Sequence, residues 1–219
     1  MVTTHIYTPP PNDALKIIHH DDDILVLSKP SGLLSVPGRA ETHKDCLETR
    51  VQAKFATARI VHRLDMDTSG LMVMAIHTDA HRALGVQFEK REVSKSYIAD
   101  VWGGLKNDSG RIELPLRCDW PNRPRQIVDF DLGKEAITDW EVLERKSDRT
   151  RVLLKPLTGR SHQLRVHMLE LGHPILGDDL YAHDEALNAS QRLHLHAHTL
   201  AFMHPRNREF VSFTSDCPF

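Results

Sequence analysis

A short polar stretch between two apolar segments carries the residue types best suited to chemistry. The sequence VHRLDMDTSG, at 61–70, holds Asp65 and Asp67 together with Arg63 and two hydroxyl side chains. Polar groups packed between buried strands must be hydrogen-bonded or functional. An ordinary capped turn would use Asp, Thr and Ser to bond its own backbone, but it would need neither His62 nor Arg63. The stretch is therefore a candidate catalytic loop.

Three known chemistries have similar loops. Protein kinases carry an HRD loop, but here Leu64 separates Arg63 from Asp65 and the sequence has no GxGxxG loop. Phosphatases of the haloacid dehalogenase type use DxDx[TV], which Asp65 and Asp67 nearly match, although Ser69 stands where Thr or Val is expected. HRLDxxTSG is the signature of the RluA family of pseudouridine synthases, which this sequence resembles.

The resemblance runs from about residue 20 to the C-terminus, in the order of the family's motifs. SKPSGLLSVPG matches at 28–38, and Lys95-Ser96-Tyr97 resembles the family's K-x-Y element. PLRCDWPNRPRQ resembles its arginine-bearing substrate loop, LKPLTGRSHQLRVHMLELGHPILGDDLY its third motif, and LHAHTLAFMHP its closing strand. The strongest likeness is to a short member that modifies both a 23S rRNA stem-loop and a tRNA anticodon stem-loop.

The resemblance implies an RNA uridine isomerase: the N-glycosidic bond breaks, the uracil rotates, and its C5 bonds to C1′. Asp65 matches the essential carboxylate, which attacks the sugar or assists loss of the base. Arg165 matches the arginine that pairs with this carboxylate and fixes it. Tyr97 matches the tyrosine that stacks on the flipped uracil and assists proton removal. The resemblance implies no cofactor and no metal.

RNA binding and base flipping require further residues. The resemblance implies that Arg63 occupies the space left by the base and that His62 contacts phosphate or sugar. Because alternate residues of a strand share a face, we expect Arg63 and Asp65 to point the same way. Cations around an exposed aromatic side chain are typical of a loop that binds phosphate and stacks on bases. The other expected RNA contacts are Arg117, Trp120, Arg123, Arg125 and Arg160.

Two further features have alternative interpretations. We expect Asp67 to face outward and to be dispensable. His194, His196 and His198 alternate with metal-compatible spacing, but the family's closing strand accounts for this segment, so no metal is expected. The alternatives to an isomerase are a magnesium-dependent phosphohydrolase that uses Asp65 and Asp67, and a non-catalytic RNA-binding module.

Composition is that of a soluble globular protein. The chain has 219 residues, of which 40% are hydrophobic and 26% charged, with a net charge of −2. A chain of this size buries about 70% of the surface that its unfolded form exposes, so it needs no disulfides. The near-neutral charge argues mildly against a nucleic-acid binder but is compatible with a local basic face. Three widely spaced cysteines fit a reducing cytosol.

We expect a cytoplasmic protein. No apolar run approaches the ~20 residues of a membrane span, and MVTTHIYTPPPND lacks the pattern of a secretory signal. No sustained heptad or spare apolar face is left over, so we expect a monomer without an obligate protein partner. Residues 1–219 are expected to form a single pseudouridine synthase catalytic domain with an irregular lead-in at 1–14 and no S4-like domain.

The apolar pattern predicts an α+β fold, a large, mostly antiparallel mixed sheet flanked by a few helices. Helices are expected at 43–56, capped by Thr42, at 78–90, capped by Thr78 or Asp79, and at 162–171, capped by Ser161, with Leu164, Met168 and Leu171 on its apolar face. Strands are expected at 24–30, 60–64, 71–76, 97–103, 111–116, 137–145, 150–156, 193–203 and 209–214.

Overall fold

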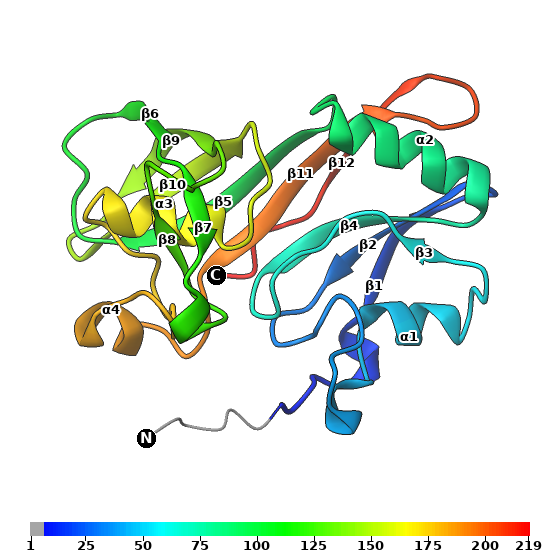
Figure 1. The fold of residues 1–219 in the computed structure, drawn as a ribbon, viewed down its shortest axis with the longest axis horizontal. Coiled ribbons are helices and arrows are strands. Elements are labelled where there is room, and N and C mark those ends of the chain that lie inside the picture. The colour runs from blue at the N-terminus through cyan, green and yellow to red at the C-terminus, as the bar shows by residue number, and fades with distance from the viewer. Residues whose placement is uncertain (1–6) are drawn as a thin grey trace. The chain divides into compact units, whose positions relative to one another are not determined.

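The computed structural model describes residues 7–219, so the first six residues of the expected lead-in lie outside the described part. Figure 1 shows the order of the helices and strands along the chain. The chain divides into two compact units: unit 1 is Met1–Val93 with Leu200–Ser215, and unit 2 is Ser94–Thr199 with Asp216–Phe219. Strand β11 (Leu195–Met203) therefore begins in unit 2 and ends in unit 1.

Unit 1 is built on two strands that each contain a buried apolar run, Ile24 to Leu27 and Leu71 to Ala75. β4 (Ser69–Ala75) is buried throughout, and β2 (Ile24–Lys29) is buried except for the half-buried Ser28, which is typical of strands covered on both faces. They pair in antiparallel fashion, with Val26 opposite Val73. The other strands of the unit are β1 (Lys16–His20), which pairs with β2, β3 (Arg59–Ile60), which pairs with β4, and β12 (Phe210–Thr214), which pairs with β11.

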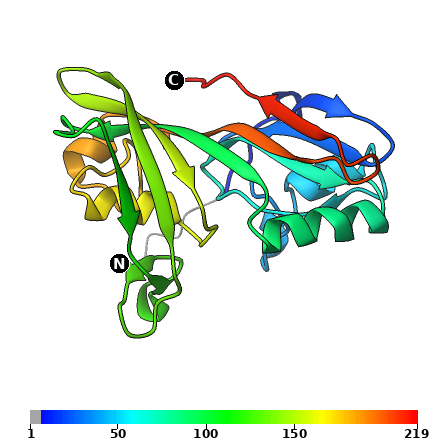
Figure 2. The same ribbon diagram turned by 90° about the horizontal axis from the view of Figure 1, so that it is seen from above.

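Helix α2 (Thr78–Glu89) lies along one face of the unit 1 strands (Figure 2). Its buried residues Ala80 and Leu84 pack into a hydrophobic cluster with residues of β2, β4 and β11. The other helical segments of this unit are α1 (Leu47–Gln52) and the 3-10 turns η1 (Asn12–Ala14) and η2 (Glu41–His43). No helix within residues 7–219 is both long enough and apolar enough to cross a membrane.

Unit 2 contains antiparallel strands in the order β5-β10-β9-β6. Their bounds are Ser94–Trp102 for β5, Arg149–Pro156 for β10, Ile137–Arg145 for β9 and Ser109–Glu113 for β6. Val152 and Leu154 of β10 are buried and pack with Leu164 and Met168 of α3 (Gln163–Glu170). The remaining elements are β7 (Leu116–Cys118), β8 (Gln126–Val128), the 3-10 turn η3 (Trp120–Asn122) and α4 (Asp184–Asn188).

The α+β expectation is confirmed, and β9 has the bounds that the sequence predicts. Four short elements were not expected, namely β1, β7, β8 and α4. Each has at most five residues, too few for a hydrophobic period to be recognised. The segment expected to be extended at 60–64 is a strand only at Arg59–Ile60.

The first helix begins later than predicted, and both of the first two helices are capped by residues other than those predicted. Helix α1 starts after Cys46, since Cys46 is extended and Glu41–His43 forms a separate 3-10 turn. Thr42 therefore does not cap it. Helix α2 is capped by His77, whose Nδ1 accepts a hydrogen bond from the backbone N–H of Ala80 at 3.3 Å.

Helix α3 also differs from its predicted form at both ends. It begins after His162, which has a φ of 52°, in the left-handed region, so Ser161 is not its cap. Leu171 follows the helix and is 37% exposed, so it does not belong to the buried face. Gly172 then ends the segment with a φ of 85°, a conformation that glycine adopts at low cost.

Candidate active site

Asp65 lies in the loop between β3 and β4 of unit 1 and is half-buried. Arg63 is exposed in the same loop. Because β3 ends at Ile60, the strand argument that placed Arg63 and Asp65 on one face was wrong. The loop nevertheless has a defined conformation, because its backbone forms hydrogen bonds with the segment that follows β2.

Hydrogen bonds from the segment SKPSGLLS (28–35) hold the loop on both sides of Asp65. They involve two serine hydroxyls and one backbone N–H. Ser35 Oγ donates to the Leu64 carbonyl at 2.6 Å and accepts from the Leu64 N–H at 3.2 Å. The Gly32 N–H donates to the Met66 carbonyl at 3.0 Å. Ser31 Oγ donates to the carbonyl of the next residue, Asp67, at 2.7 Å. The carbonyls flanking Asp65 are therefore fixed in direction.

Lys29 adds the strongest connection between these two segments. Its side chain is fully buried, and its ammonium donates to the carbonyls of Pro30 at 3.0 Å, Leu33 at 2.7 Å and Met66 at 2.7 Å. An ammonium has three hydrogens, and each of them has an acceptor here. Sequence reasoning did not single out Lys29, although it opens the family-like KPSG element.

We expect Lys29→Met to lower the free energy of unfolding by on the order of 3 kcal/mol, because buried carbonyls lose their charged donor. The catalytic rate should fall as well, since the Met66 carbonyl lies beside Asp65. Urea denaturation would measure the loss, and Lys54→Met, at an exposed position, is the matched control. Equal stability of the two variants would contradict this role for Lys29.

Asp67 is half-buried, and its backbone carbonyl already accepts from Ser31. The resemblance assigns the reaction to the Asp65 carboxylate alone, so we expect Asp67→Ala to keep activity within about threefold of wild type. Tritium release from labelled RNA would test this. Total loss of activity would instead favour a reaction that uses both carboxylates, as a phosphohydrolase does.

His62 is bonded within unit 1. Its Nε2 accepts from the Val73 N–H of β4 at 3.1 Å, and its ring stacks on Phe88 of α2 with centroids 4.6 Å apart. These contacts fix the start of the loop against the strand and the helix. They give His62 a structural role that the sequence did not indicate.

In unit 2, Tyr97 lies on β5, opposite Leu154 of β10, and is half-buried against the hydrophobic cluster. Lys95 lies two residues earlier on the same strand. Ser96, between them, is buried and hydrogen-bonds Thr199 at 2.6 Å. Alternation along the strand therefore places Lys95 and Tyr97 on the face opposite Ser96.

Arg165 of α3 is 3% exposed and has carboxylate partners in unit 2. It donates from Nε and Nη2 to Asp178 at 2.8 and 2.6 Å, and from Nη2 to Asp179 at 3.1 Å. The Asp178 side chain is fully buried. Sequence reasoning assigned Arg165 to Asp65 and missed both of these carboxylates, although GDDLY stands in the motif that identified the arginine.

Tyr181 connects this pair to the β7–β8 hairpin. The Arg165 guanidinium lies 5.2 Å from the Tyr181 ring centroid, a cation–π distance. The Tyr181 hydroxyl accepts from the Gln126 N–H of β8 at 2.8 Å and is 2.7 Å from His162 Nδ1. The hairpin, helix α3 and the GDDLY loop are thus held together around Arg165.

The hairpin turn presents the exposed aromatic residue that the sequence predicts. Trp120 is 65% exposed in η3, and the Arg123 guanidinium lies 4.5 Å from its ring centroid. Arg125 is exposed on the same turn and lines a surface hollow that includes Tyr181 and His183. Cations and an exposed indole are therefore adjacent at this tip, as nucleic-acid contact requires.

Two other arginines predicted to bind RNA have bonds inside unit 2. Arg117 is paired with Asp129 across the hairpin, and its hydrogen bond holds the pKa of the Asp129 carboxyl below its usual range. Arg160 donates from Nε to the Glu135 carbonyl at 2.9 Å. The Asp129 carboxylate therefore balances the charge of Arg117. The Glu135 carbonyl is uncharged and does not balance the charge of Arg160.

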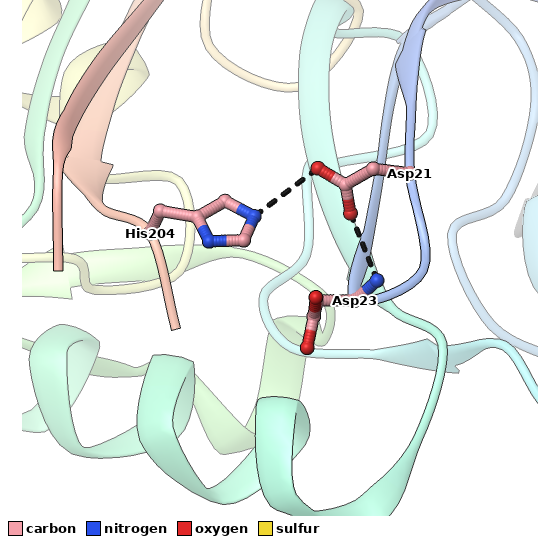
Figure 3. Close-up of side chains that lie close together, drawn as sticks. All are labelled: Asp21, Asp23 and His204. Carbon is pink, nitrogen blue, oxygen red and sulfur yellow. Dashed lines mark hydrogen bonds and ion pairs between the residues drawn. The ribbon is translucent and has the colours of Figure 1, made fainter. Parts of the chain in front are cut away.

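Within residues 7–219, one group has donor atoms close enough to hold a metal ion: Asp21, Asp23 and His204 of unit 1 (Figure 3). His194, His196 and His198 do not form such a group. His204 Nδ1 accepts from the Arg206 N–H at 3.3 Å, so its Nε2 carries the hydrogen and donates to Asp21 Oδ2 at 3.1 Å. Asp23 Oδ2 lies 2.6 Å from Arg206 Nε.

These bonds explain the cluster without a ligand. Burial raises the pKa of the Asp21 carboxyl, but hydrogen bonds from His19, from two backbone N–H groups and from His204 outweigh burial and hold it well below its usual range. A guanidinium on Asp23 and a protonated Nε2 on His204 occupy the positions that a cation would need. The cluster joins the turn after β1 to the segment after β11.

Two solved structures have a similar fold. Human RNA pseudouridylate synthase domain containing 1 is 31% identical, with a TM-score of 0.81, over 97% of this chain and 87% of that one. Human RNA pseudouridylate synthase domain containing 4 is 26% identical, with a TM-score of 0.74, over 93% and 88%. The fold, with an aspartate-bearing loop between β3 and β4, is that of the pseudouridine synthases.

Named proteins are more similar still. The dual-specificity RNA pseudouridine synthase RluA of Escherichia coli K12 is 53% identical over 214 residues, 97% of this chain and 98% of that protein. The protein of the same name from Yersinia pestis is 54% identical over 204 residues, 93% and 99% of the two chains. The RNA pseudouridylate synthase family model matches residues 23–170. The chain belongs to this family and isomerises uridine in RNA to pseudouridine.

Proposed function

We propose that the chain modifies uridines in two RNAs, a large-subunit rRNA stem-loop and a tRNA anticodon stem-loop. The observation that carries this proposal is the similarity, along nearly the whole chain, to relatives named as dual-specificity enzymes. The loop around Asp65 supports uridine isomerisation. It carries the HRLDxxTSG motif, and the carbonyls of Leu64 and Met66 on either side of Asp65 accept hydrogen bonds from Ser35 and Lys29.

Asp65 acts as the essential carboxylate in this proposal. If it attacks C1′, the N-glycosidic bond breaks as an ester to the sugar forms, and C5 of the rotated uracil then bonds to C1′ and displaces the Asp65 carboxylate. If it adds to the uracil ring, the N-glycosidic bond breaks, C5 bonds to C1′ after rotation, and elimination from the ring releases the carboxylate. The C5 proton then leaves to solvent, with Tyr97 stacked on the base and assisting its removal. Arg165 positions the reacting groups. The chemistry needs no cofactor and no metal. The family model matches residues 23–170, which include parts of both units, so we propose that the chain constitutes one catalytic domain.

RNA binding follows from the exposed cations. Trp120, Arg123 and Arg125 at the hairpin tip bind phosphate and stack on a base. Arg160, which is half-buried in the loop before α3, adds a further cation for phosphate. Arg63 occupies the space of the extruded base, whose unstacking costs a few kcal/mol. His62 and Arg117 also contribute to the RNA surface, although their bonds within the protein leave them less capacity for it.

Tritium release tests the function directly. Wild-type protein is incubated, without metal, with rRNA-fragment and tRNA transcripts labelled at uridine C5. Release from both transcripts is the expected result, because C5 must lose its hydrogen when it bonds to C1′. Release from one transcript alone would contradict dual specificity, and release from neither would contradict the choice of targets.

We also propose that the enzyme works in the cytoplasm as a monomer. Two points support this proposal: the proposed substrates are cytoplasmic RNAs, and the three cysteines are free thiols. Sedimentation velocity at micromolar concentration should give a single species of the 25.0 kDa chain. A dimer would contradict the proposal.

A further inference from the structure

Lys95 is a half-buried cation that the proposed chemistry leaves without a role. Burial lowers the pKa of its ammonium. Throughout the described residues, this ammonium has neither a hydrogen bond nor an ion pair. It differs in this respect from Lys29, which is fully buried but has three carbonyl acceptors. An unpaired, partly desolvated charge is unfavourable for the free protein, so it needs a reason to be there.

The position of Lys95 connects it to the proposed active-site tyrosine. Lys95 and Tyr97 are two residues apart on β5 and share a face, so their backbone positions are about 6.6 Å apart. The Lys95 ammonium also lies 3.7 Å from the point that a Cβ on Gly159 would occupy. Gly159 belongs to the loop that leads into α3 and Arg165. The absence of a side chain there leaves space beside the ammonium.

We propose that Lys95 binds a backbone phosphate of the nucleotide whose base stacks on Tyr97. The inference rests on the proposed function and adds to it a contact with a particular part of the substrate. Two strand residues span roughly the separation between the base and the phosphate of one nucleotide. A cation and an aromatic ring at this separation can therefore hold both ends of the target nucleotide.

The charge of the ligand is what favours phosphate over the uncharged groups of RNA. An ammonium that has lost part of its hydration gains most from a full negative charge, because a charge-assisted hydrogen bond is stronger than a neutral one. A uracil carbonyl would leave the charge largely uncompensated. The salt dependence of binding distinguishes the two, since each phosphate contact releases counterions.

The experiment measures the affinity of full-length protein for the tRNA anticodon stem-loop transcript between 50 and 200 mM KCl. Lys95→Gln should weaken binding about 10-fold or more. It should also reduce the slope of log affinity against log salt by about 0.7 to 0.9. Lys95→Arg should retain the slope. Lys106→Gln, an exposed lysine on unit 2, is the matched control and should retain both values.

A second readout separates binding from a structural role. Because Lys95 has no partner among residues 7–219, Lys95→Gln should unfold at or above the wild-type temperature. Removal of a lysine with a structural role would instead lower the unfolding temperature. An unchanged salt slope overturns the proposal, whether or not affinity falls. A changed slope with a lowered unfolding temperature also overturns it. Failure of the proposed function would be recognised by a different result: wild-type protein would release no tritium from either transcript.

Discussion

Asp65→Asn is expected to abolish tritium release, with a fall in rate of at least about 1000-fold, because asparagine has neither the charge nor the nucleophilicity of a carboxylate. The fold should survive the change. The bonds that fix the loop use the backbone of Leu64, Met66 and Asp67, and none of these bonds involves the Asp65 side chain. RNA affinity should also be retained, since the proposed phosphate contacts lie elsewhere.

The matched control is Asp67→Asn, which makes the same chemical change two residues along the same loop. It should remain active, so that loss in Asp65→Asn alone assigns the role to one carboxylate. Both variants are compared with wild type by tritium release, RNA affinity and thermal unfolding. An active Asp65→Asn protein would contradict the assignment. Loss of activity together with loss of folding would show that Asp65 is structural.

Much of the candidate site was visible in the sequence because each of its residues lies within a short continuous motif. HRLDMDTSG identifies Asp65 directly, and the alternation of YIADVWG places Tyr97 on a strand. The partners of these residues are separated in sequence and were missed. Lys29 bonds Met66 across 37 residues, and nothing in a local pattern indicates which carbonyls a buried lysine will meet.

The fold was predictable where hydrophobic runs are long. β2 and β4 contain apolar runs of four and five residues, Ile24 to Leu27 and Leu71 to Ala75, and both strands overlap the expected ranges. Helix ends were less predictable because caps depend on backbone geometry. His77 accepts the N–H of Ala80 although Thr78 and Asp79 are the more common capping types. The left-handed conformation of His162 likewise has no signal in the sequence.

The second large effect concerns Arg165, whose pairing in the structure alters what its removal should do. If Arg165 acted only on Asp65, Arg165→Met would lose activity at unchanged stability. Instead its guanidinium forms a bidentate pair with Asp178, whose side chain is fully buried. Removing one partner of a buried pair leaves an uncompensated charge, which costs about 3 to 5 kcal/mol. We therefore expect Arg165→Met to lose both stability and activity.

Arg111 provides the matched control, because it also forms a bidentate pair, with Asp139 at 2.6 and 2.9 Å, but both side chains are exposed. Exposed pairs contribute about 0 to 1 kcal/mol, so Arg111→Met should unfold close to wild type in urea. Arg165→Lys keeps the charge but loses the planar guanidinium, and its stability should fall between wild type and Arg165→Met.

Equal unfolding free energies for Arg165→Met and Arg111→Met would contradict a positioning role through Asp178. They would restore the simpler view that Arg165 serves the reacting carboxylate alone. The expected order, with Arg111→Met most stable and Arg165→Met least, would instead mean that the arginine is held by the GDDLY loop before RNA binds.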